Sequence, residues 1–538
     1  MCTSGSCAHA DPTAAALEER RTTRRGLLLA GAATTTYAAL ATVAPAAAGT
    51  TSTRVFTGRF TGLPGEADWH YLPVRVPRGV RALEVSYSYE KVETPVGFSA
   101  NVVDVGLFGP AGTALGRERG FRGWSGGART SFRVGRGGAT PGYLAGPVTP
   151  GTWRVALGPF AVVPPGVDYR VEVRLVHGPP ERAERPRVAP TAVRGTGPGW
   201  YRGDLHTHTV HSDGRRTQAD LVREARAAGL DFVCSTEHNT SSASLTWGRH
   251  APDDLLVVQG EEVTTRAGHW LALGLPAGRW VDWRYRPADG QLDRFVQQVR
   301  ALGGLAVVAH PHAPTPGATW GFGTGPGDWS GMDAVELANG PWTLDDEVTL
   351  AAWHAQLVAG RFVPAVGSSD SHHPGQPVGR AQTVAWLPTL STRAVVAALR
   401  AGRCWLAESS AVQLALTARL GTRTAGIGEA LGAGAADVVG VRLEVGGVPG
   451  CLAQVVGPAG PLGGAVTDAD GRAAVALDLP AGLVPFVRAE VRRLDGAPVA
   501  NPVQGVPGLA VVALTNPVWL GVRPTGPAAR PGRDASSG

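Results

Sequence analysis

The rhythm of the sequence changes near residue 200, and this change most constrains the fold. Between residues 200 and 412, short apolar runs alternate with amphipathic segments that have the 3.6-residue period of helices. Strands joined by helical crossovers lie parallel in one sheet, so this segment is predicted to form a distorted (β/α)7 barrel. The seven expected strands are Arg202–His206, Phe232–Thr236, Leu255–Val258, Trp270–Leu273, Leu305–Ala309, Ala334–Leu337 and Val363–Val366.

Four helices are expected between these strands. Thr217 is a suitable N-cap for the first of them, because its hydroxyl can accept a hydrogen bond from the first helical turn. Glycines that can adopt a positive φ follow three of the helices, at Gly229, Gly303 and Gly360. The expected helices are Gln218–Ala228, Gln291–Ala301, Leu344–Ala359 and Arg393–Ala401.

The segments on either side are rich in short alternating runs separated by Gly and Pro, and the chain contains 74 Gly and 42 Pro. This pattern is typical of antiparallel sheets, and it predicts a β-sandwich of jelly-roll type at 54–177 and a second β-sandwich at 413–522. The two predicted sandwiches flank the α/β segment at 200–412. A Pro-rich linker is expected at 178–199 and a disordered tail at 523–538.

The N-terminus has the features of an export signal. Arg24 and Arg25 precede an apolar stretch that runs to about Ala44, and Ala46–Ala48 supplies a small-residue cleavage site. Residues 1–48 are therefore predicted to be a twin-arginine signal peptide, with the mature chain secreted or at the cell surface and without a transmembrane domain. An uncleaved membrane anchor is the alternative, although the stretch is short and interrupted by Thr34–Thr36.

Composition excludes several classes of protein. Apolar residues make up 43% and charged residues 17%, which excludes a mostly disordered chain and a polytopic membrane protein. The net charge of +6 comes from scattered arginines, since Lys91 is the single lysine, so a nucleic-acid scaffold is not expected. Cys234, Cys404 and Cys451 remain after cleavage and form no disulfide framework, with a Cys404–Cys451 pair left open.

Histidines and carboxylates gather at the predicted strand ends. Eleven of the 14 His lie between Tyr201 and Gln413, and six of the expected strands end in, or are bordered by, a His or a carboxylate. Because the ends of parallel strands meet at one edge of a sheet, these side chains predict a metal site there. The motifs are Asp204-Leu205-His206-Thr207-His208 with Ser212-Asp213-Gly214, Glu237-His238, Glu261-Glu262, Gly268-His269, His310-Pro311-His312 and Asp370-Ser371-His372-His373.

In this order, the motifs resemble those of the PHP (polymerase and histidinol phosphatase) superfamily of metal-dependent hydrolases. Within it, Ala334–Gly340 and Val366–His372 resemble the CehA/McbA-type metallohydrolases. The resemblance covers about residues 200–412 and leaves the flanking β-rich segments unexplained. Two positions depart from the family pattern: Glu237 stands where Asp is common, and Ala338 stands where Trp is frequent.

The resemblance implies two or three divalent transition metals, of which Zn, Mn and Fe all suit such ligands. It also implies a hydroxide that bridges two ions, with Glu262 and Asp370 as catalytic residues that hold them. The first ion would be held by His206, His208, Glu262 and Asp370; the second by Glu262, His269 and His310; and the third by Asp213, His238 and His372.

Several further residues are candidates for the site. His312 is placed either as a catalytic proton donor or as a loop histidine. Arg266, Asn339 and Arg380 are candidate substrate-binding residues. Other polar neighbours are expected to have no role in the site: Glu261 should face away from it, and His211 and His373 should be solvated.

The leading hypothesis is an exported phosphoesterase that acts on a small anionic phosphoester. The alternatives are an ester, amide or carbamate hydrolase with the same metal centre, a domain that binds metal without catalysis, and a non-catalytic surface protein whose β-domains bind envelope polymers.

Overall fold

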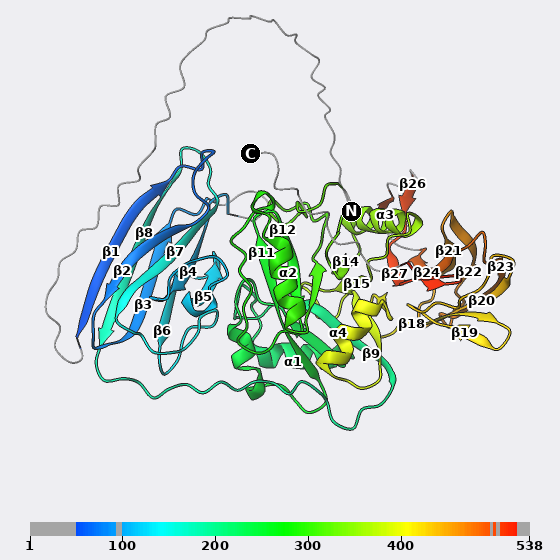
Figure 1. Cartoon of the computed structure of the whole chain (residues 1–538), viewed down its shortest axis with the longest axis horizontal. Coiled ribbons are helices and arrows are strands. Elements are labelled where there is room, and N and C mark those ends of the chain that lie inside the picture. Colours follow the sequence, from blue (N-terminus) through cyan, green and yellow to red (C-terminus); the bar gives the residue numbers. More distant parts are fainter. Residues whose placement is uncertain (1–49, 93–98, 326, 495–498, 502–505, 525–538) are drawn as a thin grey trace, which may run out of the picture. The chain divides into compact units, whose positions relative to one another are not determined.

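The structure is a computed structural model that describes residues 50–92, 99–325, 327–494, 499–501 and 506–524 (Figure 1). The chain divides into a unit Met1–Ala38 and a unit Ala39–Gly538, and every described residue belongs to the second. The predicted signal peptide at 1–48 and residues 525–538 of the predicted tail lie outside the described residues.

The first eight strands form two antiparallel four-stranded sheets, with the orders β1-β8-β3-β6 and β2-β7-β4-β5 (Figure 1). Leu72 and Val155 from one sheet share an apolar core with Leu83 and Val173 from the other, as in a β-sandwich. The strands are β1 (Thr51–Phe60), β2 (His70–Val76), β3 (Val80–Tyr89), β4 (Val102–Phe108), β5 (Phe121–Gly126), β6 (Ser131–Gly135), β7 (Gly151–Ala161) and β8 (Val167–His177), with a 3-10 turn η1 at Glu118–Gly120.

The following segment builds one continuous sheet in the order β15-β14-β13-β12-β11-β10-β9-β16-β17. Its short strands are buried on both faces, as in Phe232–Ser235 and Leu305–Val308, where every residue is buried. The strands are β9 (Gly199–Thr207), β10 (Phe232–Ser235), β11 (Leu256–Thr265), β12 (Gly268–Leu273), β13 (Leu305–Val308), β14 (Ala334–Asn339), β15 (Ala365–Ser368), β16 (Gln382–Leu387) and β17 (Cys404–Ala407).

The prediction of a (β/α)7 barrel is wrong in its closure, because the described strands form an open sheet. β9 pairs antiparallel with β16 on the side away from β10, so β15 remains at the edge of the sheet. β12 is antiparallel to β11, because only Arg266 and Ala267 separate the two strands and leave no room for a helical crossover. β12 is also antiparallel to β13. Between the ends of β15 and β9, an isolated parallel bridge joins Thr207 to Ser371 without a ladder.

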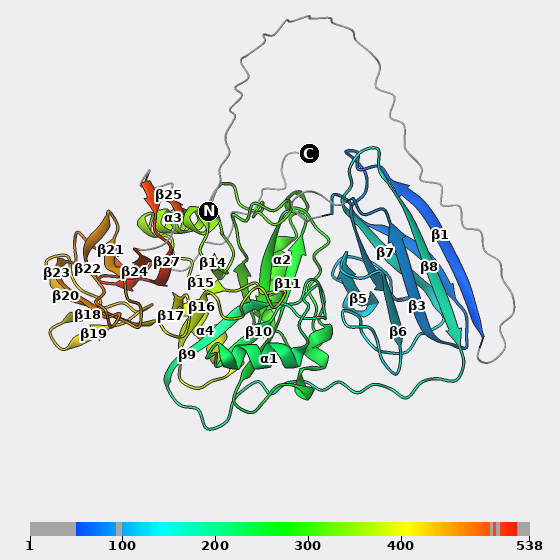
Figure 2. The ribbon, with the colours of Figure 1, turned by 180° about the vertical axis from the view of Figure 1, so that it is seen from behind.

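The four predicted helices are confirmed to within one residue at each end. The side chain of Thr217 accepts a hydrogen bond from Asp220 N, and Gly229, Gly303 and Gly360 all have φ between 70° and 83°. α2 packs against β12 and β13 and lies beside β11 in the view from behind (Figure 2). The helices are α1 (Gln218–Ala227), α2 (Leu292–Ala301), α3 (Leu344–Val358) and α4 (Thr392–Ala401), with 3-10 turns η2 (Ser242–Leu245), η3 (Trp247–Arg249) and η4 (Pro287–Asp289).

The C-terminal strands extend the same sheet instead of forming a separate pair of sheets. Trp405 of β17 pairs with Thr515 of β27, and the sheet continues through β24, β21 and β22. A second sheet, β19-β18-β20-β23, shares an apolar core with these strands. The strands are β18 (Gln413–Leu420), β19 (Arg423–Ala425), β20 (Val438–Gly446), β21 (Cys451–Gly457), β22 (Gly460–Val466), β23 (Ala473–Pro480), β24 (Phe486–Arg493), β25 (Val499–Asn501), β26 (Val506–Gly508), β27 (Val511–Thr515) and β28 (Val518–Trp519).

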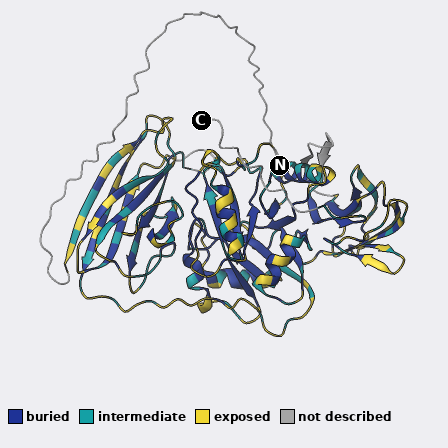
Figure 3. Cartoon of the chain, in the orientation of Figure 1, coloured by how far each residue is buried: buried dark blue, intermediate teal, exposed yellow. Residues whose placement is uncertain are grey.

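Burial follows these layers: the strands of the central sheet are mostly dark blue, the strands of the first β-rich segment carry buried and exposed residues, and the helices have exposed outer faces (Figure 3). Cys234, Cys404 and Cys451 are all buried, and the Cys404–Cys451 disulfide left open by the sequence is not formed. Among the described residues, no helix has both the length and the apolar character needed to cross a membrane.

Candidate metal centre

The structure brings all nine predicted ligands together in three groups of side chains that could each hold a metal ion. They lie on β9, β11 and β12 or in the loops that follow β9, β10, β13 and β15. The groups are His206, His208, Glu262 and Asp370; Glu262, His269 and His310; and His208, Asp213, His238 and His372. His208 thus belongs to two groups, whereas the sequence analysis assigned it to the first ion alone.

Two imidazoles and two carboxylates converge in the first group. His206 Nε2 lies 3.2 Å from Glu262 Oε2 and 3.3 Å from Asp370 Oδ1. His208 Nε2 lies 3.0 Å from Asp370 Oδ1 and 3.4 Å from Glu262 Oε2. Because all four atoms face one point, they present the mixture of nitrogen and oxygen ligands that divalent transition metals prefer.

The second and third groups adjoin the first through Glu262 and His208. Glu262 Oε1, the oxygen not used in the first group, lies 2.8 Å from His269 Nδ1 and 3.3 Å from His310 Nε2. In the third group, Asp213 Oδ1 lies 3.4 Å from His238 Nε2 and 3.5 Å from His372 Nε2. The carboxylate of Glu262 is therefore divided between two groups, one oxygen to each, as a bridging ligand requires.

Within the described residues, two buried atoms of the first group make no well-aligned hydrogen bond, and this fits a cation. His206 Nε2 and Glu262 Oε2 face each other at 3.2 Å without one. Leaving such atoms unpaired costs free energy, and coordination of a metal removes that cost. The donor set therefore fits divalent ions.

The charges of the centre are strongly coupled. Burial raises the pKa of the Glu262 carboxyl, but the imidazoles of His238 and His206 outweigh burial and hold this pKa well below its usual range. Burial lowers the pKa of His208 to about 3, with help from His372 and His238, so His208 is neutral at pH 7. A neutral imidazole is the form that binds a metal.

The backbone is held in uncommon conformations beside the ligands. His310 has a φ of 25° and Asp370 a φ of 48°, and Asn239, next to His238, has a φ of 54°. Positive φ is costly for residues other than glycine and is concentrated at functional sites. Gly214 is needed for a different reason, since a Cβ there would lie 2.5 Å from the backbone of His208.

Glu336 is the functional residue that the sequence analysis missed. Its Oε1 lies 3.2 Å from His206 Nδ1, and its Oε2 accepts hydrogen bonds from His310 N at 2.8 Å and Asn339 Nδ2 at 2.8 Å. A carboxylate on the outer nitrogen of a ligating histidine fixes the ring and directs its other nitrogen at the metal. The signal was a Glu within β14, the only strand of β9–β15 for which no ligand had been predicted.

We expect Glu336→Gln to weaken metal binding by roughly 10–100-fold, because the amide orients His206 less firmly than the carboxylate does. Asn339→Ala is the comparison, since it removes one hydrogen bond from Glu336 but keeps the carboxylate. Competition titration with a chromogenic chelator measures the affinity of both variants. Equal affinity for wild type and Glu336→Gln would contradict this role for Glu336.

Two further buried carboxylates position the loops that carry ligands. Asp204 accepts hydrogen bonds from the backbone N–H groups of His206 at 3.3 Å, Ser369 at 3.0 Å and Gly379 at 2.8 Å. Glu237 accepts from Thr209 N at 3.1 Å and from the Ser212 hydroxyl at 2.6 Å, and so fixes the loop before Asp213. Glu237 thus positions the loop that carries Asp213.

The other candidate residues differ in whether they contact the metal centre. Asn339 Nδ2 reaches Asp370 Oδ2 at 3.4 Å, whereas Arg266 donates to the carbonyls of Pro159 and Asp68 and lines a cavity with Asp213. Glu261 faces away, as predicted, and accepts from Val281 N at 3.0 Å. The prediction for His211 is wrong: its ring is buried against the Ser242 hydroxyl at 2.9 Å because the η2 turn covers it.

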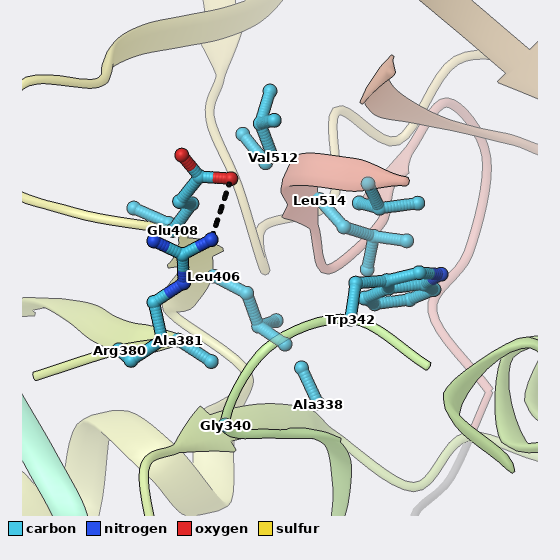
Figure 4. A pocket seen from close by; sticks show the side chains of 12 residues that line it. Ala338, Gly340, Trp342, Arg380, Ala381, Leu406, Glu408, Val512 and Leu514 are labelled. Carbon is cyan, nitrogen blue, oxygen red and sulfur yellow. Dashed lines mark ion pairs between the residues drawn. The ribbon is translucent and has the colours of Figure 1, made fainter. Parts of the chain in front are cut away.

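Arg380 lies beside a cavity of about 20 Å³ that Ala338 and Trp342 also line (Figure 4). Its guanidinium pairs with Glu408 at 3.5 Å. This space has room for little more than a water molecule, so the predicted role of Arg380 in substrate binding gains no support from it.

His312 makes no hydrogen bond to any of the nine ligands within the described residues. Its Nδ1 lies 2.9 Å from Thr349 Oγ1, and that hydroxyl donates to Asp345 O at 2.8 Å. The hydroxyl must therefore accept from His312, which places the proton on Nδ1 and leaves Nε2 as the free nitrogen. Burial lowers the pKa of His312, so its neutral form dominates at pH 7.

Comparison with known proteins gives distant similarities. No protein-family profile matches the chain. An uncharacterized protein of Methanocaldococcus jannaschii is 24% identical over 125 residues, which span 21% of this chain and 69% of that protein. A two-domain protein from Bacteroides vulgatus containing a predicted PHP-like metal-dependent phosphoesterase matches 62% of this chain and 100% of its own, with 18% identity and a TM-score of 0.33.

An amidohydrolase from Chromobacterium violaceum, solved with bound sulfate and no metal, matches 33% of this chain and 89% of its own, with 18% identity and a TM-score of 0.25. Both TM-scores are below 0.5, so neither structure defines the fold of this chain.

Proposed function

We propose that the chain is an exported metal-dependent hydrolase of the PHP superfamily, of the CehA/McbA type, that cleaves a phosphoester. The observation that carries this proposal is the division of Glu262 between two groups of imidazoles, with Oε2 toward His206 and Oε1 toward His269 and His310. Two ions held on either side of one carboxylate are the arrangement that hydrolytic two-metal sites use.

Ions bound in this centre would lower the pKa of water toward about 7 and neutralise charge that develops on phosphoryl oxygens. The residues of the chain hold that arrangement in place. Glu336 accepts the Nδ1 proton of His206 and keeps Nε2 unprotonated toward the site, while Asp370 faces His206 and His208 from β15. Because Glu262 is buried, water screens the charge of its carboxylate only weakly, and this charge would attract a bound cation strongly.

Substrate panels test the reaction. Metal-loaded protein is expected to cleave phosphomonoesters or phosphodiesters and to be inhibited by added phosphate and vanadate. Cleavage of carbamates or carboxylic esters without inhibition by phosphate would favour the alternative hydrolase. Full metal content with no turnover on any ester would favour a non-catalytic binding protein.

His312→Ala is expected to leave the metal content unchanged, because within the described residues His312 makes no hydrogen bond to any of the nine ligands. If Nε2 protonates the leaving group, turnover of alkyl phosphates should fall by roughly 10²–10⁴-fold, whereas nitrophenyl phosphate should lose much less. A proton donor must itself be protonated. The contribution of His312 to turnover should therefore decline as pH rises through the lowered pKa of His312. Steady-state turnover of both esters by wild type and His312→Ala tests this role. An equal loss of turnover on both esters would argue against His312 as the proton donor.

Export through the twin-arginine route is a further part of the proposal, and it concerns residues outside those described. We expect the double change Arg24→Lys and Arg25→Lys to leave the precursor in the cytoplasm, because this route depends on the arginine pair. Immunoblots of cell fractions measure the distribution. Unchanged secretion of the double variant would point to another route.

A further inference from the structure

A cavity of about 390 Å³ opens beside the metal centre, between it and the first β-rich segment. Asp213 and His238 of the third group line one side. The opposite side comes from the outer face of the sheet β2-β7-β4-β5, including Asp104 and Trp124. A cavity of this size holds a single small ring system and lies where a group attached to the reacting atom would extend.

The packing between the two segments is tight enough to give this cavity a fixed shape. Phe121 stacks on Trp280 with ring centroids 4.2 Å apart and an interplanar angle of 7°. Arg284 donates to the Tyr71 hydroxyl at 2.5 Å and to Thr113 O at 3.0 Å. These buried contacts between distant parts of the chain make the β-rich segment a wall of the site.

The walls are aromatic. Trp69, Trp124 and Trp283 all line the cavity and contact one another, with ring centroids 4.6 to 5.8 Å apart. Phe160 and Tyr89 complete the aromatic lining. Rigid aromatic surfaces of this kind favour the flat faces of a ring.

One carboxylate in this aromatic lining, that of Asp104, receives no hydrogen bond from the described residues. Val103 and Val105 point into the core of the β-rich segment, so Asp104 between them on β4 faces the cavity. No described residue donates a hydrogen bond to its carboxylate, and Arg266 and His238 act on it through charge alone. Burial raises the pKa of Asp104 to about 6, so the group is an anionic acceptor at pH 7.

The cations around the cavity disfavour a positively charged occupant. The Arg266 guanidinium lies 4.9 Å from the ring centroid of Trp69 and 5.4 Å from that of Phe160, and the Lys91 ammonium lies 5.7 Å from that of Tyr89. An ammonium ligand would meet two like charges where it would need free aromatic faces. An uncharged group that donates a hydrogen bond therefore suits the Asp104 carboxylate better than an ammonium group does.

We propose that this cavity receives the leaving group of the substrate, that this group is a ring bearing a hydroxyl, and that Asp104 accepts the hydrogen bond from that hydroxyl. The inference rests on the proposed hydrolysis of a phosphoester at the adjoining metal centre. The ring can belong to a hydroxyaryl compound or to a sugar, which share this chemistry.

Ring binding is tested on the full, metal-loaded chain by titration calorimetry and tryptophan fluorescence. The probes are resorcinol, glucose and 1,3-dimethoxybenzene, which has the ring of resorcinol without a donor. At least one of the first two should bind tenfold or more tightly than dimethoxybenzene, and whichever binds better identifies the class of ring.

Three variants locate the effect. Asp104→Leu should abolish the preference for the hydroxylated ring, and Gly127→Leu should abolish binding of every ring, because its side chain would extend into the cavity. Asp168→Asn, on the exposed surface of β8, is the matched control and should leave binding unchanged. No preference in wild type, or the same preference in Asp104→Leu, would overturn the proposal.

Turnover separates this inference from the proposed function. Asp104→Leu should lower kcat/KM for 3-hydroxyphenyl phosphate about tenfold more than kcat/KM for ethyl phosphate, at constant metal content. An equal loss of kcat/KM on both esters would overturn the role of Asp104 in recognising the leaving group. If the protein binds the rings as predicted but cleaves neither ester, that result would overturn the proposed phosphoesterase activity and would still support binding of a ring in this cavity.

Discussion

Glu262→Gln is expected to remove at least one metal ion per chain and to lower kcat/KM by roughly 10³-fold or more, about 4 kcal/mol of transition-state stabilisation. The change replaces a carboxylate, each of whose oxygens faces a different group of imidazoles, with a neutral amide of the same shape. Two cations would then repel each other without the negative charge between them. Elemental analysis and steady-state kinetics of the purified variant measure both effects.

The neighbouring Glu261 provides the matched control. It is equally buried but faces away from the centre, and burial raises its pKa well above the usual range. Glu261→Gln nearly keeps the shape of a side chain that belongs to none of the three groups of ligands, and it should keep the metals and the activity. Wild-type metal content in Glu262→Gln would overturn the assigned centre, and equal losses in both variants would indicate general damage to β11.

Removing the metals is expected to abolish activity and to lower the thermal stability of the chain. An ion present at a thousandfold excess over its Kd stabilises the folded state by about 4 kcal/mol, which for a large domain corresponds to roughly 10 °C in Tm. Without metal, the buried carboxylates are balanced only by protons on histidines. Burial lowers the pKa of His238, but Glu262 and Asp213 outweigh it and raise that pKa to about 10.

The sign of the pH dependence follows from this raised pKa. Protonated His238 contributes stability to the metal-free protein that is fully present below pH 6.5, its unfolded pKa, and is lost as pH rises toward about 10. The metal-loaded protein has already released these protons, so its stability should change less. Calorimetric scans at pH 6 and pH 9, with and without chelator, should show a larger effect of the chelator at pH 9. A smaller effect at pH 9 would contradict the proposed exchange of protons for metal.

The ligand set could be predicted from the sequence because most ligands lie near the end of an expected strand. A His directly after an apolar run, as at His310 after Leu305–Ala309, is visible in the local pattern, and the structure brings the ligands together. The helices were predictable for the same reason, since Thr217 and Gly229 mark the ends of one of them locally.

The pairing of the strands could not be predicted in this way. Nothing in the alternation of Gln382–Leu387 indicates that it pairs with β9, and this pairing leaves the sheet open where a closed barrel was expected. The continuation of the sheet from Trp405 to Thr515 likewise depends on contacts far apart in the sequence. Glu336 was missed because a buried Glu in an apolar strand gives no local sign that its partners are His206 and His310.

The metal-to-protein ratio tests the central claim most directly. Protein purified without exposure to chelator and analysed for Zn, Mn and Fe should contain about two to three ions per chain, as the three groups of ligands predict. Fewer than one ion per chain, in protein whose folding is verified by a cooperative thermal transition, would contradict the metal centre and the hydrolytic function proposed from it.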